Sequence, residues 1–409
     1  MDINFLFAPA SVDSADAAID HLQRSGIWEP FDDRAVSFVN QFSSSLLRTV
    51  GIHQYPDLVA LAYWFRRASI KKLSKAYTNG DEFIRVGRGL SLHIAPSNVD
   101  TIFVYSFFLS LLSGNSSFIR VSQNESPQVN ILITVFNEIY EAGDSEAAAR
   151  FVICTYPHDS QVTSIVSRCC DIRLIWGGDD TVSVIGALPL KPTATELKFP
   201  NRSSFSAVKL DALETLSNEG LQKLTSLFYN DIKLFGQQAC SSPIAIYFIG
   251  LPSESAQIDR FWEFFILAAQ QHSIEPSEVM NRFVSACSMA VSGVVDSNRT
   301  SFDSTNVVVL DGIIASEKTF RIDHSGEGLL IQYILSSITD LALHVDTQDQ
   351  TLSTFGFTKD EIEVFAKNLF NRGIDRIVPI GEALDFGHIW DGTDLIDAMS
   401  RKIDISKFR

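Results

Sequence analysis

From residue 89 onward, the chain alternates between short apolar runs of strand type and longer runs with helical spacing. The strand comes first in each pair, and this alternation is typical of βαβ units in a mainly parallel sheet. Four consecutive pairs predict a doubly wound, Rossmann-type nucleotide-binding lobe. The expected strands, each with the helix that follows it, are 90–95 with 101–112, 117–121 with 128–141, 151–155 with 161–167, and 172–176 with 181–188.

The remaining segments predict a second α/β lobe and a helical N-terminal region. Residues 1–80 read as mostly helical, with amphipathic stretches at 36–47 and 60–73. We therefore expect a helical region over 1–80, a nucleotide-binding lobe over 81–202, a second lobe over 203–375, and a tail over 376–409 that returns to the nucleotide-binding lobe or to a neighbouring subunit. The strands expected in the second lobe are 205–208, 244–249, 307–310, 329–334 and 353–357.

Charge and cysteine content narrow the class of protein. With 409 residues and 45% hydrophobic composition the chain can build two sizeable cores. A net charge of −16 and the lack of a basic run argue against a nucleic-acid partner. Five cysteines without metal-ligand spacing predict a reduced, cytoplasmic protein with no metal site. The N-terminus has no positive n-region and the apolar run 102–112 is too short to span a bilayer, so we expect neither export nor a membrane anchor.

One cysteine, Cys240, lies in a small polar loop between a helical pattern and an apolar strand pattern. Gly236 can end the helix, and Pro243 has no N–H to give a central strand ladder. A free cysteine is often only a small buried hydrophobe. At such a junction, however, a thiol can face a cleft, which makes Cys240 a candidate nucleophile. The loop reads Phe235-Gly236-Gln237-Gln238-Ala239-Cys240-Ser241-Ser242-Pro243.

Two polar loops follow strands of the first lobe. Ser97 and Asn98 come after the strand 90–95, at the edge of the sheet where ligands bind in open α/β folds. Gly177, Gly178 and Asp179 come after the strand 172–176, and paired glycines before a helix let a pyrophosphate approach backbone amides. Asn98 and Asp179 also suit a helix N-cap, which is the structural alternative for each.

Arg120 ends the second expected strand, from which a cation can reach the adenosine ribose or its phosphate. A solvated arginine at a strand end is the alternative. Ser122 follows, and no acidic residue occurs before Glu125, so nothing nearby in the sequence repels a ribose phosphate.

Taken together, the thiol loop and the strand-end loops resemble the aldehyde dehydrogenase superfamily, and more closely its acyl-CoA reductase branch of the LuxC type. The resemblance runs from about residue 85 to about residue 400 and contains four ordered segments, which are more specific together than singly. These segments are Gly89-Leu90-Ser91-Leu92-His93-Ile94-Ala95-Pro96-Ser97-Asn98-Val99, then Leu112-Ser113-Gly114-Asn115 with Ile119-Arg120-Val121-Ser122, then Gly236 to Pro243, and then Gly373-Ile374-Asp375-Arg376-Ile377-Val378-Pro379-Ile380-Gly381-Glu382-Ala383-Leu384-Asp385-Phe386.

The resemblance implies an aldehyde dehydrogenase-like fold, with a Rossmann-type cofactor lobe, an α/β catalytic lobe and a crossing C-terminal tail. It implies that Cys240 is the nucleophile and that Asn98, with the Cys240 backbone amide, forms the oxyanion hole. NADPH is the expected cofactor, with NADH as the alternative. The residues expected to contact the cofactor are Ser97, Arg120, Ser122, Gly177, Gly178 and Asp179.

Two departures from the superfamily pattern bear on the reaction. Hydrolytic aldehyde dehydrogenases carry a base in a Glu-Leu-Gly-Gly motif, whereas Glu196-Leu197 here runs into Lys198-Phe199-Pro200, which leaves Glu196 a weak candidate for that base. The Glu-x-Phe-Gly-Pro motif is replaced too, and His324-Ser325-Gly326-Glu327-Gly328 stands near its place. Both losses favour reduction of a thioester over oxidation to a free acid, because reduction needs no activated water.

The sequence thus predicts NAD(P)H-dependent reduction of an acyl-CoA or acyl-protein thioester to an aldehyde, through a thioester on Cys240. The resemblance implies a long-chain acyl group and a partner acyl-protein synthetase, and we expect a homo-oligomer. Two alternatives stay open. One is an oxidative aldehyde dehydrogenase, and the other is a non-catalytic subunit that holds the acyl group in a multienzyme complex.

Overall fold

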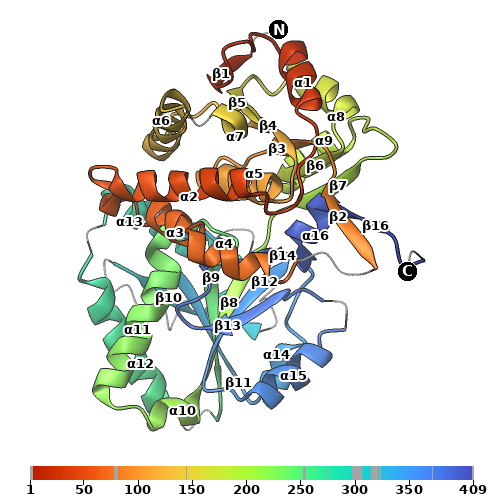
Figure 1. The fold of residues 1–409 in the computed structure, drawn as a ribbon. Helices are drawn as coiled ribbons and strands as arrows, with labels where there is room; N and C mark the ends of the chain where they lie inside the picture. Colours follow the sequence, from red (N-terminus) through yellow and green to blue (C-terminus); the bar gives the residue numbers. More distant parts are fainter. Residues whose placement is uncertain are drawn as a thin grey trace. The chain divides into compact units, whose positions relative to one another are not determined.

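The structure, a computed structural model, describes residues 3–77, 82–143, 145–251, 255–272, 274–296, 306–314, 321, 324–370 and 372–407. The chain forms two compact units (Figure 1). Unit 1 contains Met1–Asn201 together with Phe386–Arg409, and unit 2 contains Arg202–Asp385. Each unit is built on a six-stranded sheet, which confirms the predicted α/β class.

The sheet of unit 1 has the strand order β1-β5-β4-β3-β6-β7, and only the β1 pairing is antiparallel. After β1, at the edge beside β5, the chain continues at β3, moves outward through β4 and β5, and then returns to the other side of β3 with β6. The point where the order reverses lies between β3 and β6, which is where open α/β sheets bind ligands. The strands are β1 (Asn4–Phe7), β3 (Leu90–Ile94), β4 (Ser116–Arg120), β5 (Phe151–Thr155), β6 (Ile172–Trp176) and β7 (Thr195–Phe199).

Helices cover this sheet, so its central strands are apolar throughout. All residues of β3, β4 and β6 are buried, as expected for a parallel sheet covered on two faces. Every residue of α5 is also buried, because this helix is apolar around its whole circumference. The helices of unit 1 are α1 (Ala15–Arg24), α2 (Asp33–Arg48), α3 (Pro56–Trp64), α4 (Arg67–Ser74), α5 (Ile102–Leu112), α6 (Pro127–Glu141), α7 (Ser145–Ala148), α8 (Val162–Cys169), α9 (Asp179–Gly186), α16 (Leu395–Met399) and a 3-10 turn at Ile52–Gln54.

The end of the chain closes unit 1. Strand β16 (Ser400–Asp404) pairs antiparallel with β2 (Phe83–Gly87), and β14 (Ile389–Trp390) pairs with β15 (Thr393–Asp394). Asn115 ties this tail to the sheet, because its side-chain N–H donates to Met399 O at 2.9 Å. The Asn115 carbonyl accepts from the N–H groups of Arg88 and Gly89, so Asn115 has a structural role in the segment that the sequence related to adenosine binding.

Unit 2 contains an all-parallel sheet in the order β10-β11-β9-β8-β12-β13. The strands are β8 (Ser203–Lys209), β9 (Pro243–Ile249), β10 (Val308–Asp311), β11 (Leu329–Leu335), β12 (Asp349–Phe355) and β13 (Arg376–Pro379). The helices are α10 (Leu210–Glu214), α11 (Asn218–Lys233), α12 (Ser255–Ala269), α13 (Pro276–Val291), α14 (Ile338–Leu341), α15 (Lys359–Lys367) and the 3-10 turn η2 (Leu234–Gln237).

The observed boundaries differ from the expected ones in three places. Residues 1–80 do not stand apart as a helical region, because β1 extends the first sheet by pairing with β5. The expected helix 60–73 is two helices, since Arg66 takes an extended conformation between α3 and α4. The segment 376–385 belongs to unit 2, because β13 pairs with β12, so the part of the tail that returns to unit 1 starts at Phe386.

Candidate active site

The Cys240 loop begins with an unusual backbone turn. Three consecutive residues after α11, namely Phe235, Gly236 and Gln237, have left-handed φ values of 59°, 58° and 63°. This conformation costs non-glycine residues about 1–3 kcal/mol each, so it persists only where surrounding contacts enforce it. Two of the three residues are not glycine, so the turn must be held by other groups.

The Gln237 side chain supplies three of those contacts. It is 4% exposed, and its amide N–H group donates to Pro243 O at 2.7 Å and to Leu329 O at 2.9 Å. Its carbonyl accepts from the Gly328 N–H at 2.8 Å. Gln237 thereby joins both ends of the thiol loop to the first residues of β11.

The segment 324–328 packs directly against this loop. Glu327 N–H donates to Gly236 O at 3.0 Å, and the Gln238 side chain donates to Ser325 O at 2.8 Å. Gly326 has a φ of +76°, and a Cβ there would lie 2.5 Å from the Gln238 amide nitrogen and 3.0 Å from Gly236 O. The segment that replaces the Glu-x-Phe-Gly-Pro motif in the sequence therefore braces the Cys240 loop within unit 2.

His324, at the start of that brace, is neutral at physiological pH. Burial lowers its pKa to about 4, and its Nδ1 accepts from the Gly326 N–H at 3.0 Å. His324 thus fixes the brace and carries no charge to the loop at neutral pH.

Cys240 is partly exposed, and its carbonyl accepts from the Ser204 hydroxyl at 2.6 Å. Cys169 is also partly exposed, and Cys287 is exposed. Cys154 and Cys170 are buried, and burial raises the pKa of both thiols, that of Cys170 to about 12. A thiol with a raised pKa is a poor nucleophile at neutral pH, so neither is suited to attack an acyl group.

Asp231 anchors the C-terminal signature to the helix that precedes the loop. Its carboxylate lies on α11 and accepts from Gly381 N–H at 2.7 Å and from Ala383 N–H at 3.2 Å. Burial raises the pKa of Asp231 to about 7. One buried carboxylate therefore connects the segment 376–385 to the helix that leads to Cys240.

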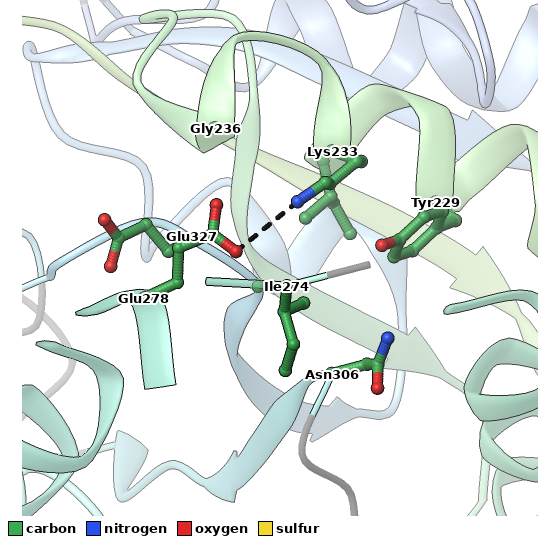
Figure 2. Close-up of a pocket in the computed structure, with 9 residues that line it drawn as sticks. Tyr229, Lys233, Gly236, Ile274, Glu278, Asn306 and Glu327 are labelled. Carbon is green, nitrogen blue, oxygen red and sulfur yellow. Dashed lines mark ion pairs between the residues drawn. The ribbon is translucent and has the colours of Figure 1, made fainter. Parts of the chain in front are cut away.

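A small pocket lies beside the turn, with Gly236 among its lining residues (Figure 2). An ion pair of 3.5 Å joins Lys233 to Glu278 beside it. None of the residues predicted to act in catalysis or cofactor binding lines this pocket. Its lining residues are Tyr229, Ile232, Lys233, Gly236, Ile274, Glu278, Asn306, Glu327 and Gly328.

In unit 1, the two predicted polar loops follow β3 and β6, the strands that flank the reversal point. Ser97 and Asn98 are both exposed. The helix α5 starts only at Ile102, with Thr101 at its N-cap, so the alternative that Asn98 is the cap is wrong. Exposure at a strand end suits a role toward a ligand, which leaves the predicted role of Asn98 open to test.

The Gly177-Gly178 turn leads directly into α9. Gly178 is the N-cap and Asp179 is the first helical residue, so the cap alternative for Asp179 is wrong as well. Its carboxylate accepts from the Asn201 N–H at 3.0 Å. One carboxylate oxygen of Asp179 is therefore bonded to Asn201, outside α9, and does not cap this helix.

Arg120 ends β4 as predicted, but it is not solvated. Its side chain is 6% exposed, and its Nη2 lies 3.5 Å from Tyr156 O and 3.4 Å from His158 Nε2. Burial lowers its pKa, yet a guanidinium stays charged in proteins. Among the described residues no carboxylate pairs with it, so the site fits an anionic group of a ligand. Nearby, the Ser122 hydroxyl accepts from the Asn124 N–H at 3.2 Å.

A buried histidine links the strands beneath these loops. His93 is hydrogen-bonded through its two ring nitrogens to Ser106 at 2.8 Å and to Ser91 at 2.9 Å. Trp176, the last residue of β6, donates to the same Ser106 hydroxyl at 3.0 Å. Burial lowers the pKa of His93 to about 3, so it is a neutral structural link between β3, α5 and β6.

Glu196 is committed to ion pairs. It pairs with Arg173, which is 1% exposed, and with Lys198 at 2.8 Å. A buried arginine needs a counter-charge. These ion pairs account for the presence of Glu196 at this position without a role in activating water.

The family model of acyl-CoA reductases (LuxC) matches residues 66–273. The match covers half of the chain and includes the Cys240 loop, the Asn98 loop and both glycines of the α9 turn. The chain belongs to the acyl-CoA reductase (LuxC) family.

Curated relatives of this LuxC-family chain are named for thioester reduction. It is 25% identical over 203 residues to a long-chain acyl-protein thioester reductase of Aliivibrio fischeri, which covers 47% of this chain and 40% of the relative. It is also 25% identical over 164 residues to long-chain acyl-protein thioester reductase 2 of Photobacterium leiognathi, which covers 40% of this chain and 32% of that one. The matches thus span less than half the length of these relatives.

Solved structures confirm the fold of this LuxC-family chain. Indole-3-acetaldehyde dehydrogenase AldA of P. syringae, determined with NAD+, aligns with a TM-score of 0.67 at 12% identity, over 98% of this chain and 92% of that one. Aldehyde dehydrogenase 21 of Physcomitrella patens aligns with a TM-score of 0.69 at 9% identity, over 96% and 90%. The predicted aldehyde dehydrogenase-like fold is confirmed. In the described part of the chain, no helix is long and apolar enough to cross a membrane.

Sequence reasoning missed several residues that shape the site of this LuxC-family chain. Gln237 was seen only as part of a motif, and its partners Gly328 and Leu329 are about 90 positions away. Asp231 and His158 carried no local signal, because a single polar residue in a helix or loop is common.

Proposed function

We propose that this chain reduces an acyl thioester to an aldehyde with NADPH, through a covalent acyl group on Cys240. The single observation that carries the proposal is the Cys240 loop, whose left-handed turn is held by Gln237 and by the segment 324–328. A preorganised thiol loop is what an acyl-transfer enzyme needs, because the attacking atom must be fixed before the substrate arrives. Membership of the acyl-CoA reductase family supports the same reaction class.

In this mechanism the Cys240 thiolate attacks the thioester carbonyl, and the donor thiol leaves. The product is another thioester, on Sγ, so the exchange is nearly balanced in energy. The Asn98 side-chain amide and the Cys240 N–H donate hydrogen bonds to the oxyanion, and one such donor is worth about 100- to 1000-fold in rate. When NADPH is bound, its nicotinamide supplies the hydride that brings the acyl carbon to the aldehyde level. Cys240 then leaves the carbon as a thiolate.

Unit 1 fits the cofactor. Arg120, buried and without a carboxylate partner among the described residues, would hold the ribose phosphate, with Ser122 beside it in sequence. Gly177 and Gly178 would let the pyrophosphate approach the start of α9, and Asp179 follows them directly. Ser97 lies in the neighbouring loop, after β3. The preference for NADPH over NADH rests on Arg120.

A specific observation argues against each of the two alternative functions. Oxidation to a free acid needs a base for water, and the residue at the expected motif, Glu196, compensates Arg173 and Lys198. A non-catalytic subunit that only holds the acyl group would not require the locked turn before Cys240. A long-chain acyl group, an acyl-protein synthetase partner, a homo-oligomer and a cytoplasmic location stay predictions.

The experiment is anaerobic mixing of the pure protein with NADPH and a series of acyl-CoAs, with the absorbance of the reduced nicotinamide as readout. We expect consumption of NADPH in step with aldehyde release, and faster turnover with longer acyl chains. Reduction of NADP+ by aldehyde with release of free acid would support the oxidative alternative instead.

A further inference from the structure

The helical layer of unit 1 has a charge opposite to that of the chain as a whole. Residues 33–77, which run from the start of α2 and are all described by the structure, contain seven Arg and Lys residues and two acidic residues, Asp33 and Asp57, although the net charge of the chain is −16. Asp57 is 9% exposed, and burial raises its pKa. A charge asymmetry of this kind points to an anionic partner for this part of the surface.

Five of those cations lie on α4 and its immediate flanks. Arg67, Lys71 and Lys75 follow one another at four-residue spacing, which places them on one side of the helix. Ile70, on the other side, is buried. The cations form what we call the basic ridge, and all of its members are exposed: Arg66, Arg67, Lys71, Lys72 and Lys75.

The positive charges of the basic ridge lack ion-pair partners among the described residues, and neighbouring helices hold the ridge in place. None of its five side chains forms an ion pair with another residue in the part of the chain that the structure describes. Arg67 N–H donates to the Asn40 side chain on α2 at 3.0 Å. The Ser43 hydroxyl on α2 donates to Ala62 O on α3 at 2.7 Å. Helices α2, α3 and α4 therefore hold the ridge as one packed layer of unit 1 (Figure 1).

We propose that the basic ridge docks the acidic face of the protein that carries the acyl thioester. This inference rests on the proposed function, since it concerns how that substrate is delivered. The ridge extends about 12 Å from Arg67 to Lys75 at 1.5 Å per residue, which is longer than one phosphate group. Its five cations are exposed on the outside of a helix, whereas small ligands are held in concave sites. A protein surface with several carboxylates matches both the length and the charge.

Two other polyanionic surfaces fit less well. A membrane-binding helix carries large apolar residues on the face that enters the lipid. On α4 that apolar side is turned inward, and Ala68 and Ser69 are the neighbours of the ridge in sequence. A nucleic acid would have to extend past the ridge over the surface of a chain whose net charge is −16.

The test compares one acyl group on two carriers. The substrates are a long-chain acyl thioester on a purified acidic acyl carrier protein and the same acyl group on CoA. The ridge variant combines Lys71→Glu, Lys72→Glu and Lys75→Glu. The control combines Lys223→Glu, Lys359→Glu and Lys367→Glu, three exposed lysines of unit 2 that give the same change in net charge. Circular dichroism and thermal melting verify that both variants are folded.

We expect the ridge variant to lose about 10- to 100-fold in kcat/KM for the acyl-protein at low ionic strength, because like charges then meet at the docking face. The loss should shrink at about 0.5 M salt, where charges are screened within a few ångströms. The rate with acyl-CoA should stay within about twofold, and the control should resemble the wild type. Equal losses with both carriers, an equal loss in the control, or a loss that salt does not reduce would overturn the proposal.

A failure of the proposed function is distinguishable from a failure of docking. If the wild type reduces neither substrate, the reductase assignment is wrong, and binding of fluorescently labelled acyl carrier protein still tests the ridge by anisotropy. Weaker binding to the ridge variant than to the control would then support docking. Equal binding to both variants would refute it.

Discussion

The side-chain carbonyl of Gln237 accepts a hydrogen bond of 2.8 Å from the backbone N–H of Gly328, across 91 positions of sequence. This contact joins the turn before the candidate nucleophile to the first residue before β11. Because Gln237 also donates to Pro243 and Leu329, one side chain satisfies groups at three points of the site. The conformation of the Cys240 loop is thus set by a long-range contact.

Gln237→Ala tests this role. The change leaves the Gly328 N–H and two carbonyls without their partner, which we expect to cost about 2–4 kcal/mol of unfolding free energy. The factor by which kcat falls should be larger than the factor by which KM changes, because the thiol loses its fixed position. Denaturant unfolding and steady-state kinetics measure the two effects.

Gln238→Ala is the matched control for that change. Gln238 is exposed, so water can replace the hydrogen bond that its side chain donates to Ser325 O, and its loss should cost less than about 1 kcal/mol. If both variants behaved alike, the buried network of Gln237 would not be what holds the loop.

Asn98→Ala should lower turnover by about 100- to 1000-fold, because it removes one oxyanion donor. Its melting temperature should hardly change, since Thr101 and not Asn98 stands at the N-cap of α5. Rates and thermal melting are measured on the same preparation. A destabilised variant with normal turnover would contradict the assignment.

Arg120→Ala should weaken NADPH binding much more than NADH binding, and so narrow the difference between the two cofactors. The physical reason is that the buried Arg120 guanidinium, which pairs with no carboxylate in the described part of the chain, is available to a phosphate. Arg168→Ala, at an exposed arginine on α8, is the control and should change neither affinity. Equal losses of both cofactors in Arg120→Ala would place Arg120 at a group that the cofactors share.

Asp231 gives the stability of the protein a specific pH dependence. Its pKa is raised in the folded state to about 7, above the 3.8 of an unperturbed aspartate, so the folded state binds more protons between these values. Stability should therefore fall as the pH rises from about 4 to about 7, by at most about 1.4 kcal/mol per pH unit for this one group. Asp231→Asn removes the titration, and the difference in unfolding free energy between the two proteins should follow this slope. A difference that is constant with pH would show that Asp231 is ionised throughout.

Local periodicity was enough to predict the strands and loops around the reversal point of unit 1. The loops that contain Asn98 and Gly177 follow β3 and β6 as expected. Each loop lies within one strand-helix pair of about 25 residues, so the local pattern is enough to place it. The contacts of Gln237 with Leu329 and of Asp231 with Gly381 could not be predicted. They join residues about 90 and 150 positions apart, and neither partner has a distinctive type.

Short strands also could not be predicted from the sequence. The strand β1, over Asn4–Phe7, has only four residues and gains its stability from pairing with β5 rather than from its own pattern. The strand β13 ends in Pro379, which suits an edge position but reads as an irregular tail in the sequence. The burial of Arg120 was also missed, since a charged residue at a strand end is usually solvated.

The most direct test of the central claim is intact-mass analysis of the pure protein after incubation with an acyl-CoA in the absence of reduced cofactor. The account predicts a single acyl adduct, which peptide mapping places on Cys240 and which Cys240→Ala lacks. Cys287, the exposed thiol on α13, serves as an internal comparison because it is accessible without being in the loop. An adduct on Cys287 or Cys154, or an adduct that persists in Cys240→Ala, would contradict the account.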